Sequence, residues 1–267
     1  MQLTFGFLLG AAIAGLAWRA RSLSGSGVVA ATITGGLVFG LGGFPWAVLL
    51  LAFFISSSAL SRSFGSRKST LNEKFSKGSR RDWGQVLANG GLGAALVVFY
   101  ALNGNPFWIW VAFAGAMAAV TADTWATEIG VLSTSSPRLI TNGQTVERGT
   151  SGAVSPAGNM AVFAGAGMVG ITAGIFSPPG GFLPVMGVTI LGGVCGALFD
   201  SLLGASLQAI YYCPNCHKET ERYPRHTCQS ETDFLRGVTW INNEVVNFAC
   251  SAVGAGIAAG FWLVFFQ

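Results

Sequence analysis

Residues 107–128 read FWIWVAFAGAMAAVTADTWATE. The segment begins as an apolar run that is long enough to enter a bilayer, and it ends with two carboxylates and three hydroxyl groups. An ionised carboxylate in a low-dielectric region must be paired, bound to a metal or placed in a water-filled cavity. The pattern therefore predicts a membrane-spanning helix, with a candidate functional site at Asp123 and Glu128 where the helix ends.

The rest of the chain has the same apolar character. Of its 267 residues, 51% are hydrophobic and 10% are charged, whereas soluble domains carry about 25% charged residues. Apolar runs that can span a bilayer lie at 3–18, 28–42, 45–61, 85–102, 107–127, 154–176, 182–208 and 240–266. We therefore expect an all-α, polytopic transmembrane bundle of about eight helices, with residues 1–267 forming a single transmembrane domain. The first run lacks the basic flank of a signal peptide, so we expect it to be a retained helix.

Glycine is abundant, with 38 residues, and several pairs have the small-xxx-small spacing of closely packed membrane helices. These pairs are Gly36 with Gly40, Gly192 with Gly196, and Gly256 with Gly260. Either they let neighbouring helices approach closely, or glycine is simply common in spanning helices.

The positive charges are confined to alternate connections between the predicted helices. All 15 Lys and Arg residues follow the first, third, fifth and seventh runs, and the connections after the second, fourth and sixth runs carry no charge. By the positive-inside rule, we expect the basic connections to be cytoplasmic and both termini to lie on the outer side. One missed helix would scatter the basic residues over both faces, so the pattern also supports the helix count.

Polar residues of the predicted helices gather near their cytoplasmic ends. They are Asn89, Asp123, Glu128, Asn159, Asp200, Asn243 and Glu244, from five different runs. We expect Asp200 to lie about three turns before its helix ends. A single polar pocket that opens to the cytoplasm would satisfy all of these side chains.

The acids suit a magnesium-dependent reaction on phosphates. Asp123 and Asp200 offer the carboxylate oxygens that Mg²⁺ prefers, and substrate phosphates fill its other positions. Candidates for holding phosphate oxygens lie in the longest basic connection: Lys74, Lys77, Arg80 and Arg81. This combination supplies the positioning and charge neutralisation that phosphoryl transfer requires.

Other interpretations of these residues remain open. The basic connection can instead set the topology and attract anionic lipid headgroups. Asp123 and Asp200 can form structural bridges to arginines of the connections, or they can line a proton or ion pathway.

Residues 149–159, GTSGAVSPAGN, make up a glycine-rich approach to the sixth predicted helix. Ser151 and Gly152 are candidates for cradling a phosphate with backbone N–H groups at this helix N-terminus. The alternative is a merely flexible start of the helix, since no Gly-Lys-Ser/Thr motif follows.

Potential metal ligands lie in the last basic connection, within residues 211–237, between the last two helices. Cys213 and Cys216 form a CxxC pair, and His226 and Cys228 follow further along. These residue types and this spacing predict a small Zn²⁺ site in a cytoplasmic loop. A redox dithiol and unligated thiols are the alternatives.

Five segments carry a resemblance to a known family. They read DWGQVLANG (82–90), ADTWATEIG (122–130), GTSGAV (149–154), LFDSLLGASLQ (198–208) and NNEVVN (242–247). In this order they resemble the motifs of the family that contains transmembrane protein 19 and the phytyl-phosphate kinase of vitamin E (tocopherol) synthesis.

The resemblance implies an enzyme and a substrate class. It implies transfer of a phosphoryl group from a nucleoside triphosphate, expected to be CTP, to an isoprenoid monophosphate such as phytyl or geranylgeranyl phosphate, giving the diphosphate. Carried onto this chain, the family pattern places function at Asn89, Asp123, Glu128, Asn159, Asp200, Asn243 and Glu244. The Cys/His segment lies outside this pattern, so a structural role is expected for zinc.

Two other functions share these features. A lipid-phosphate cytidylyltransferase would use the same metals and substrates. An ion or solute transporter would also place acids in membrane helices, but it requires a pathway to the outer side, and the uncharged outer connections offer little to line one. The net charge of +4 comes from connections that set the topology, so no nucleic-acid partner is expected.

Overall fold

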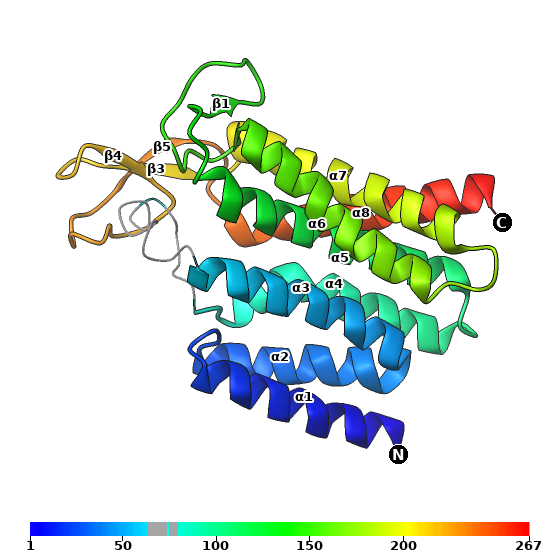
Figure 1. Cartoon of the computed structure of the whole chain (residues 1–267). Coiled ribbons are helices and arrows are strands. Elements are labelled where there is room, and N and C mark those ends of the chain that lie inside the picture. The colour runs from blue at the N-terminus through cyan, green and yellow to red at the C-terminus, as the bar shows by residue number, and fades with distance from the viewer. Residues whose placement is uncertain (64–73, 75–79, 267) are drawn as a thin grey trace.

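The computed structural model describes residues 1–63, 74 and 80–266. Within these residues, eight helices are long and apolar enough to cross a membrane, which confirms the predicted all-α bundle (Figure 1). They are α1 (Gln2–Arg19), α2 (Gly25–Leu37), which continues into the short π-helix η1 (Val38–Gly42), α3 (Phe44–Ser63), α4 (Trp83–Leu102), α5 (Phe107–Gly130), α6 (Pro156–Ile175), α7 (Phe182–Ser206) and α8 (Asn243–Phe265).

Capping side chains explain where three of the helices begin. Asp82 accepts a hydrogen bond from the backbone N–H of Gln85, and Gln85 Oε1 accepts one from the backbone N–H of Asp82, which together form a capping box. Ser155 caps α6 and Asn242 caps α8. The predicted spans 154–176 and 240–266 begin slightly too early, because apolarity alone does not reveal these caps.

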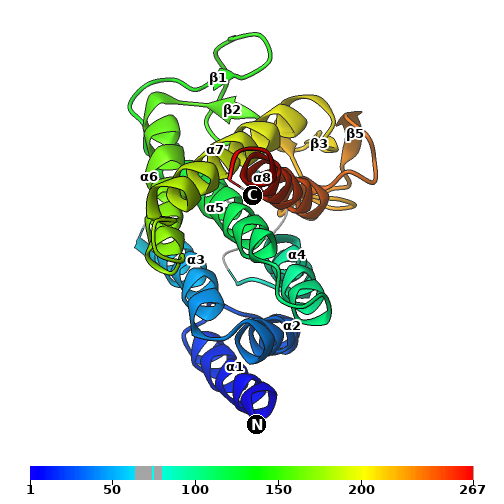
Figure 2. The ribbon, with the colours of Figure 1, turned by 90° about the vertical axis from the view of Figure 1, so that its right-hand side faces the viewer.

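Helix α5 is the centre of the bundle. It packs against α3, α4, α6, α7 and α8, and Figure 2 shows it enclosed by its neighbours. In an 18-residue apolar stretch of α5, 78% of the residues are buried, whereas the corresponding share is at most 50% in each of the other spanning helices. The rings of Trp46 on α3 and Phe113 on α5 meet in the core, with centroids 4.6 Å apart. A helix that is hydrophobic all round belongs in such a core, so residues 107–128 organise the fold.

Helices α5, α7 and α8 meet where backbone touches backbone. A Cβ added at Gly254 of α8 would lie 2.6 Å from the carbonyl oxygen of Gly115 on α5. A Cβ added at Gly192 of α7 would lie 2.5 Å from the carbonyl oxygen of Gly254. These distances are too short for any side chain, so the three helices can pack this closely only because glycine stands at each position.

Two of the three predicted glycine pairs lie in close contact with a neighbouring helix, and the third does not. At residues 36/40 and 192/196, an added Cβ would come within 2.5–2.7 Å of an atom on a neighbouring helix. At residues 256/260, no atom lies within 4 Å of the added Cβ. The last pair is therefore not a packing motif within the described part of the chain.

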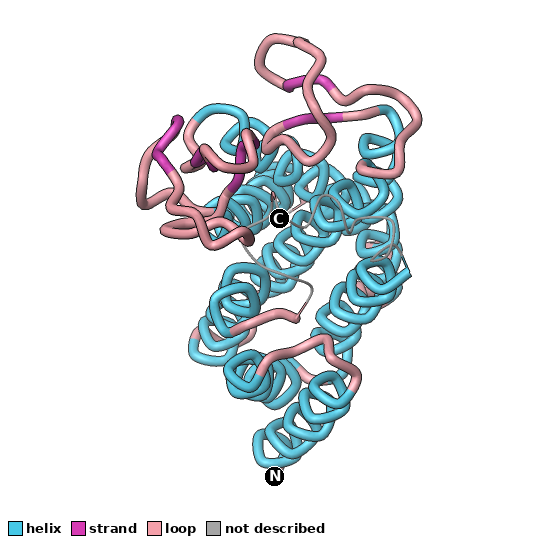
Figure 3. The backbone as a smooth tube through the Cα atoms, turned by 90° about the vertical axis from the view of Figure 1, so that its left-hand side faces the viewer, coloured by secondary structure: helices cyan, strands magenta, loops and turns pink. Residues whose placement is uncertain are grey.

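The strands and long connections gather at one end of the bundle, here called the loop end (Figures 1 and 3). Both termini lie at the opposite end (Figure 1). Strands β1 (Arg138–Leu139) and β2 (Ala153–Val154) form one antiparallel pair between α5 and α6. Strands β3 (Ile210–Cys213), β4 (Lys218–Thr220) and β5 (Asp233–Arg236) form an antiparallel sheet in the order β4-β3-β5, between α7 and α8. These small sheets hold the long connections close to the helix ends.

Candidate functional site

A cavity of about 570 Å³ lies at the loop end. Helices α4, α5, α6, α7 and α8 contribute to its walls, together with the glycine-rich turn before α6 and the segment after α7. The predicted site residues that line it are Arg81, Asn89, Asp123, Glu128, Ser151, Gly152, Asn159, Asp200 and Asn243. Side chains that lie far apart in the sequence therefore share one space.

The two candidate magnesium ligands meet in this cavity. Asp123 of α5 and Asp200 of α7 both line it, and their carboxyl groups lie close enough to interact. The Oδ2 atom of Asp200 is buried and has no hydrogen-bond partner among the described residues. Two carboxyl groups this close repel each other when both are ionised, so they require a shared proton or a bound cation. The pair is chemically suited to a hard cation.

The depth predicted for Asp200 is wrong. Asp200 lies six residues before Ser206, the last residue of α7. This separation is about 1.7 helical turns. The apolar run extends to Gln208, but the backbone leaves the helix before it. Asp200 therefore lies nearer to the loop end than about three turns would place it.

Arg81 brings positive charge to the cavity. It lies just before α4, where two backbone hydrogen bonds fix it to residues 22–24. Its guanidinium lies over the rings of Phe53 and Phe54 on α3, 5.3 and 5.5 Å from their centroids. Burial lowers the pKa of Arg81 to about 10, and the negative charge of Glu128 opposes this shift. The group therefore stays cationic at neutral pH.

Glu128 ties the end of α5 to α3. It accepts a hydrogen bond from Ser61 Oγ at 2.8 Å, and it lies close enough to Arg81 for their charges to interact. Glu128 therefore joins α3 to α5 and lies near the Arg81 guanidinium, which also lines the cavity.

Amides and the glycine-rich turn complete the lining. Asn89, Asn159 and Asn243 come from α4, α6 and α8. In the turn before α6, Gly152 has a φ of +78°, and an added Cβ would overlap Ala205 of α7. Only glycine combines this backbone conformation with so close an approach, so the turn is fixed against α7.

Some predicted site residues do not line the cavity. Lys74 Nζ is bonded to Glu147 Oε2 at 2.7 Å, and this ion pair lowers the pKa of Glu147. Arg80 donates to the carbonyl oxygen of Leu23. Glu244 lies in the first turn of α8 but does not line the cavity, whereas its neighbour Asn243 does. Lys77 lies outside the described residues.

Gln208 and Glu221 are among the cavity residues that the sequence reasoning missed. Ser151 Oγ donates to Gln208 Oε1 at 2.7 Å, and Gln208 Nε2 donates to Glu221 Oε1 at 2.9 Å. Glu221 also lies close enough to Asp200 for their carboxylates to repel each other. No helical pattern marks Glu221, because it follows β4 in the Cys/His segment. This chain of hydrogen bonds links that segment to the cavity.

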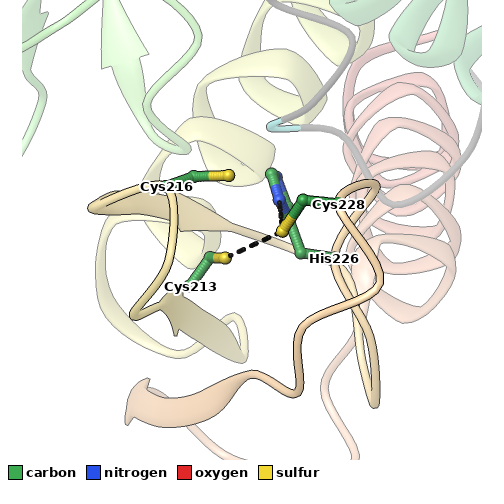
Figure 4. Close-up of side chains that lie close together, drawn as sticks. All are labelled: Cys213, Cys216, His226 and Cys228. Atoms are coloured by element: carbon green, nitrogen blue, oxygen red, sulfur yellow. Dashed lines mark hydrogen bonds between the residues drawn. The ribbon is translucent and has the colours of Figure 1, made fainter.

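The Cys/His segment brings its four candidate ligands together (Figure 4). Cys213, Cys216, His226 and Cys228 each offer a ligand atom, and these atoms all lie within 4.8 Å of one another. The Sγ atoms of Cys213 and Cys228 are 3.6 Å apart, and His226 Nδ1 lies 3.4 Å from Cys228 Sγ. Hydrogen bonds from Ser230 lower the pKa of Cys228 to about 5. The cluster is able to bind a metal ion.

Comparison with known proteins identifies relatives of this chain. A model of the family described as integral membrane protein DUF92 matches residues 8–255. Protein PGR of Arabidopsis thaliana is 33% identical over 92% of this chain and 91% of its own length. An uncharacterized membrane protein of Methanocaldococcus jannaschii is 33% identical over 70% of this chain and 75% of its own length.

Protein VTE6, chloroplastic, of Arabidopsis thaliana is 26% identical over 88% of this chain and 64% of its own length. No solved structure gives a significant match. The family model covers most of the chain, including the helices that build the cavity. The chain therefore belongs to the DUF92 family of integral membrane proteins, the transmembrane protein 19 and phytyl-phosphate kinase family that its motifs resemble.

Proposed function

We propose that the protein is a membrane-embedded kinase that transfers a phosphoryl group from a nucleoside triphosphate, CTP in the first instance, to an isoprenoid monophosphate. Phytyl and geranylgeranyl phosphate are the first acceptors to test, because the motifs resemble those of phytyl-phosphate kinase. One observation carries the proposal: the paired carboxyl groups of Asp123 and Asp200 share a cavity with the Arg81 guanidinium at the end of a membrane bundle.

In this proposal the residues of the cavity bind the substrate phosphates, orient them and neutralise their negative charge. Asp123 and Asp200 would hold Mg²⁺, and the bound ion would offset negative charge on the donor phosphates. Arg81 donates N–H groups to phosphate oxygens, and its Nη1 atom is buried without a hydrogen-bond partner among the described residues. The amides of Asn89 and Asn243 add neutral donors that fix the direction of the phosphates.

The reaction needs no strong general base. The acceptor phosphate is already ionised at neutral pH. One of its oxygens attacks the terminal phosphorus of the nucleotide, the bond from that phosphorus to the bridging oxygen breaks, and the nucleoside diphosphate leaves. Neither histidine is required, because His226 lies in the Cys/His cluster and His217 contacts Tyr212 Oη. Charge and position are what phosphoryl transfer demands.

The proposal places the loop end in the cytoplasm and both termini on the outer side. The basic connections support this orientation through the positive-inside rule. In this orientation the cavity faces the compartment that contains nucleoside triphosphates, while a lipid acceptor arrives from the bilayer.

For the Cys/His cluster, the proposal is a structural Zn²⁺ ion. Four ligands of the Cys₃His type are usual for closed, tetrahedral zinc sites. Tetrahedral zinc with Zn–S bonds of about 2.3 Å separates its sulfur ligands by about 3.8 Å, close to the 3.6 Å between Cys213 and Cys228. The ring of His226 is buried, and its Nε2 atom has no hydrogen-bond partner in the described part of the chain. Zinc here would fix the segment that carries Gln208 and Glu221 to the cavity.

The test is a product assay with purified protein in lipid nanodiscs. The protein is incubated with Mg²⁺, a panel of γ-labelled nucleoside triphosphates including CTP and ATP, and prenyl monophosphates. We expect labelled prenyl diphosphate, with product lost on chelation of Mg²⁺ and in Asp123→Asn. Release of pyrophosphate with a nucleotide-linked lipid would identify a cytidylyltransferase instead. If every pairing gives no product, the kinase proposal is wrong.

A further inference from the structure

A second pocket lies beside the cavity, among α1, α2, α3 and α4. We call it the chain pocket. Its volume is about 100 Å³, and its walls are mostly apolar side chains such as Leu9, Ala31, Leu50 and Phe54. The assigned chemistry of the cavity makes no use of this space.

The chain pocket and the cavity share one set of residues. Arg81, Gln85 and Asn89 line both. Apart from Thr34, the side chains that line the rest of the chain pocket are apolar. The pocket therefore has a cationic, hydrogen-bonding end that faces the Asp123–Asp200 pair, and an apolar body directed away from it.

The chain pocket follows the helices into the bundle. Along α1 its lining runs from Ala17 to Leu9, a rise of about 12 Å at 1.5 Å per residue. This is less than half of a hydrocarbon core of about 30 Å. Leu9 and Ile13 are only half-buried, so a long chain can continue from the pocket into the surrounding lipid.

We propose that the chain pocket binds the part of an isoprenoid chain nearest to its phosphate, with that phosphate at Arg81. This inference rests on the proposed function and names where its acceptor lies. An inorganic phosphate would leave the apolar body unfilled. A neutral lipid would offer no acceptor to Arg81 Nη1, which is buried and has no hydrogen-bond partner within the described part of the chain. An anionic headgroup joined to a flexible apolar chain satisfies both ends.

Gly35 of α2 offers a way to fill the pocket. It is half-buried, it lines the pocket, and the nearest atom to an added Cβ is Gly10 Cα, at 3.9 Å. A larger side chain at this position would occupy the space of the chain. Gly15 of α1 is a matched control, because it is also helical and half-buried, has open space at its Cβ and does not line the pocket.

The test is photo-crosslinking, which needs no turnover. Full-length protein in nanodiscs is labelled with a geranylgeranyl monophosphate that carries a diazirine near its phosphate, and labelled peptides are identified by mass spectrometry. We expect labelling on α1 to α4 that phytyl phosphate suppresses and that phytol and inorganic phosphate suppress far less. Labelling should fall about tenfold in Gly35→Leu, because leucine displaces buried methylene groups, and stay at the wild-type level in Gly15→Leu. Gly35→Ala, whose Cβ fits, should give a smaller decrease.

The outcomes separate this inference from the proposed function. Labelling of the chain pocket without turnover of any nucleotide would support lipid binding in the pocket and would contradict the proposed kinase activity. Turnover together with labelling confined to α6, α7 or α8 would support the kinase activity and would show that the isoprenoid chain does not bind in the chain pocket. Equal labelling by a diazirine phosphatidylcholine would show that ordinary bilayer lipid fills the space, and it would overturn the inference as well.

Discussion

Replacing Gly254 by alanine should force three helices apart. The new Cβ would lie 2.6 Å from both the Gly115 carbonyl oxygen and Ala119 Cβ, and 3.2 Å from the Gly192 carbonyl oxygen. Non-bonded carbon contacts are normally about 3.5 Å or longer, so the backbone of α5 or α8 must shift by close to 1 Å. Overpacking of this kind costs about 3 kcal/mol. Alanine recovers about 1 kcal/mol through its better helix propensity, which leaves a net loss of about 2 kcal/mol.

Gly256→Ala is the matched control for this prediction. It lies on the same helix, two residues away, and no atom comes within 4 Å of its added Cβ. It should therefore be neutral or stabilising by up to about 1 kcal/mol. Thermal unfolding in one detergent should show Gly254→Ala several degrees below the wild type and Gly256→Ala at or slightly above it. Equal unfolding temperatures for the two variants would refute the close contact of α5, α7 and α8.

Three further predictions concern the loop end. Asp123→Asn and Asp200→Asn should each lower Mg²⁺-dependent turnover by about 100-fold or more with little change in unfolding temperature; a variant that keeps its turnover would remove that residue from the metal site. Purified protein should contain one zinc per chain by elemental analysis, and Cys213→Ser or Cys228→Ser should lose it while Cys195→Ser keeps it; metal-free wild type would exclude the zinc. Lys74→Ala should keep wild-type turnover and change the free energy of unfolding by less than about 1 kcal/mol, because the Glu147 partner of Lys74 is 81% exposed; a large loss of turnover would place Lys74 at the substrate.

The bundle was predictable because its signals are local. Each spanning helix is an uninterrupted apolar run, and lipid permits few structures other than a helix for such a run. The helix starts were less accurate, because a cap such as Ser155 depends on backbone geometry that apolarity does not record.

The convergence of Asp123 and Asp200 followed from the alternation of helix direction. Both acids stand near helix ends that must lie on the same side of a membrane if each run spans it. The contact between the two carboxyl groups was not predictable in this way, since it depends on how α5 and α7 rotate about their axes.

Other features depend on pairings that no single segment encodes. Lys74 resembled a phosphate ligand because it lies in a basic connection, but Glu147 from a different connection binds it. Glu221 gave no signal, because its place at the cavity depends on the fold of β3 and β4 and on its hydrogen bond to Gln208. The chain pocket is likewise assembled from four helices, and its sequence is indistinguishable from that of any other apolar packing surface.

The separation of both chain ends from the loop end has a practical consequence. Affinity tags or fluorescent reporters can be fused at either end, across the thickness of the bundle from Asp123 and Asp200, without steric interference with the assay. The described residues contain eight helices that are able to span a membrane. Because an even number of spans would leave both ends in the same compartment, a protease or reporter that reaches one fusion should reach the other. A double-tagged protein in sealed vesicles thus gives an internal check on the orientation of every preparation.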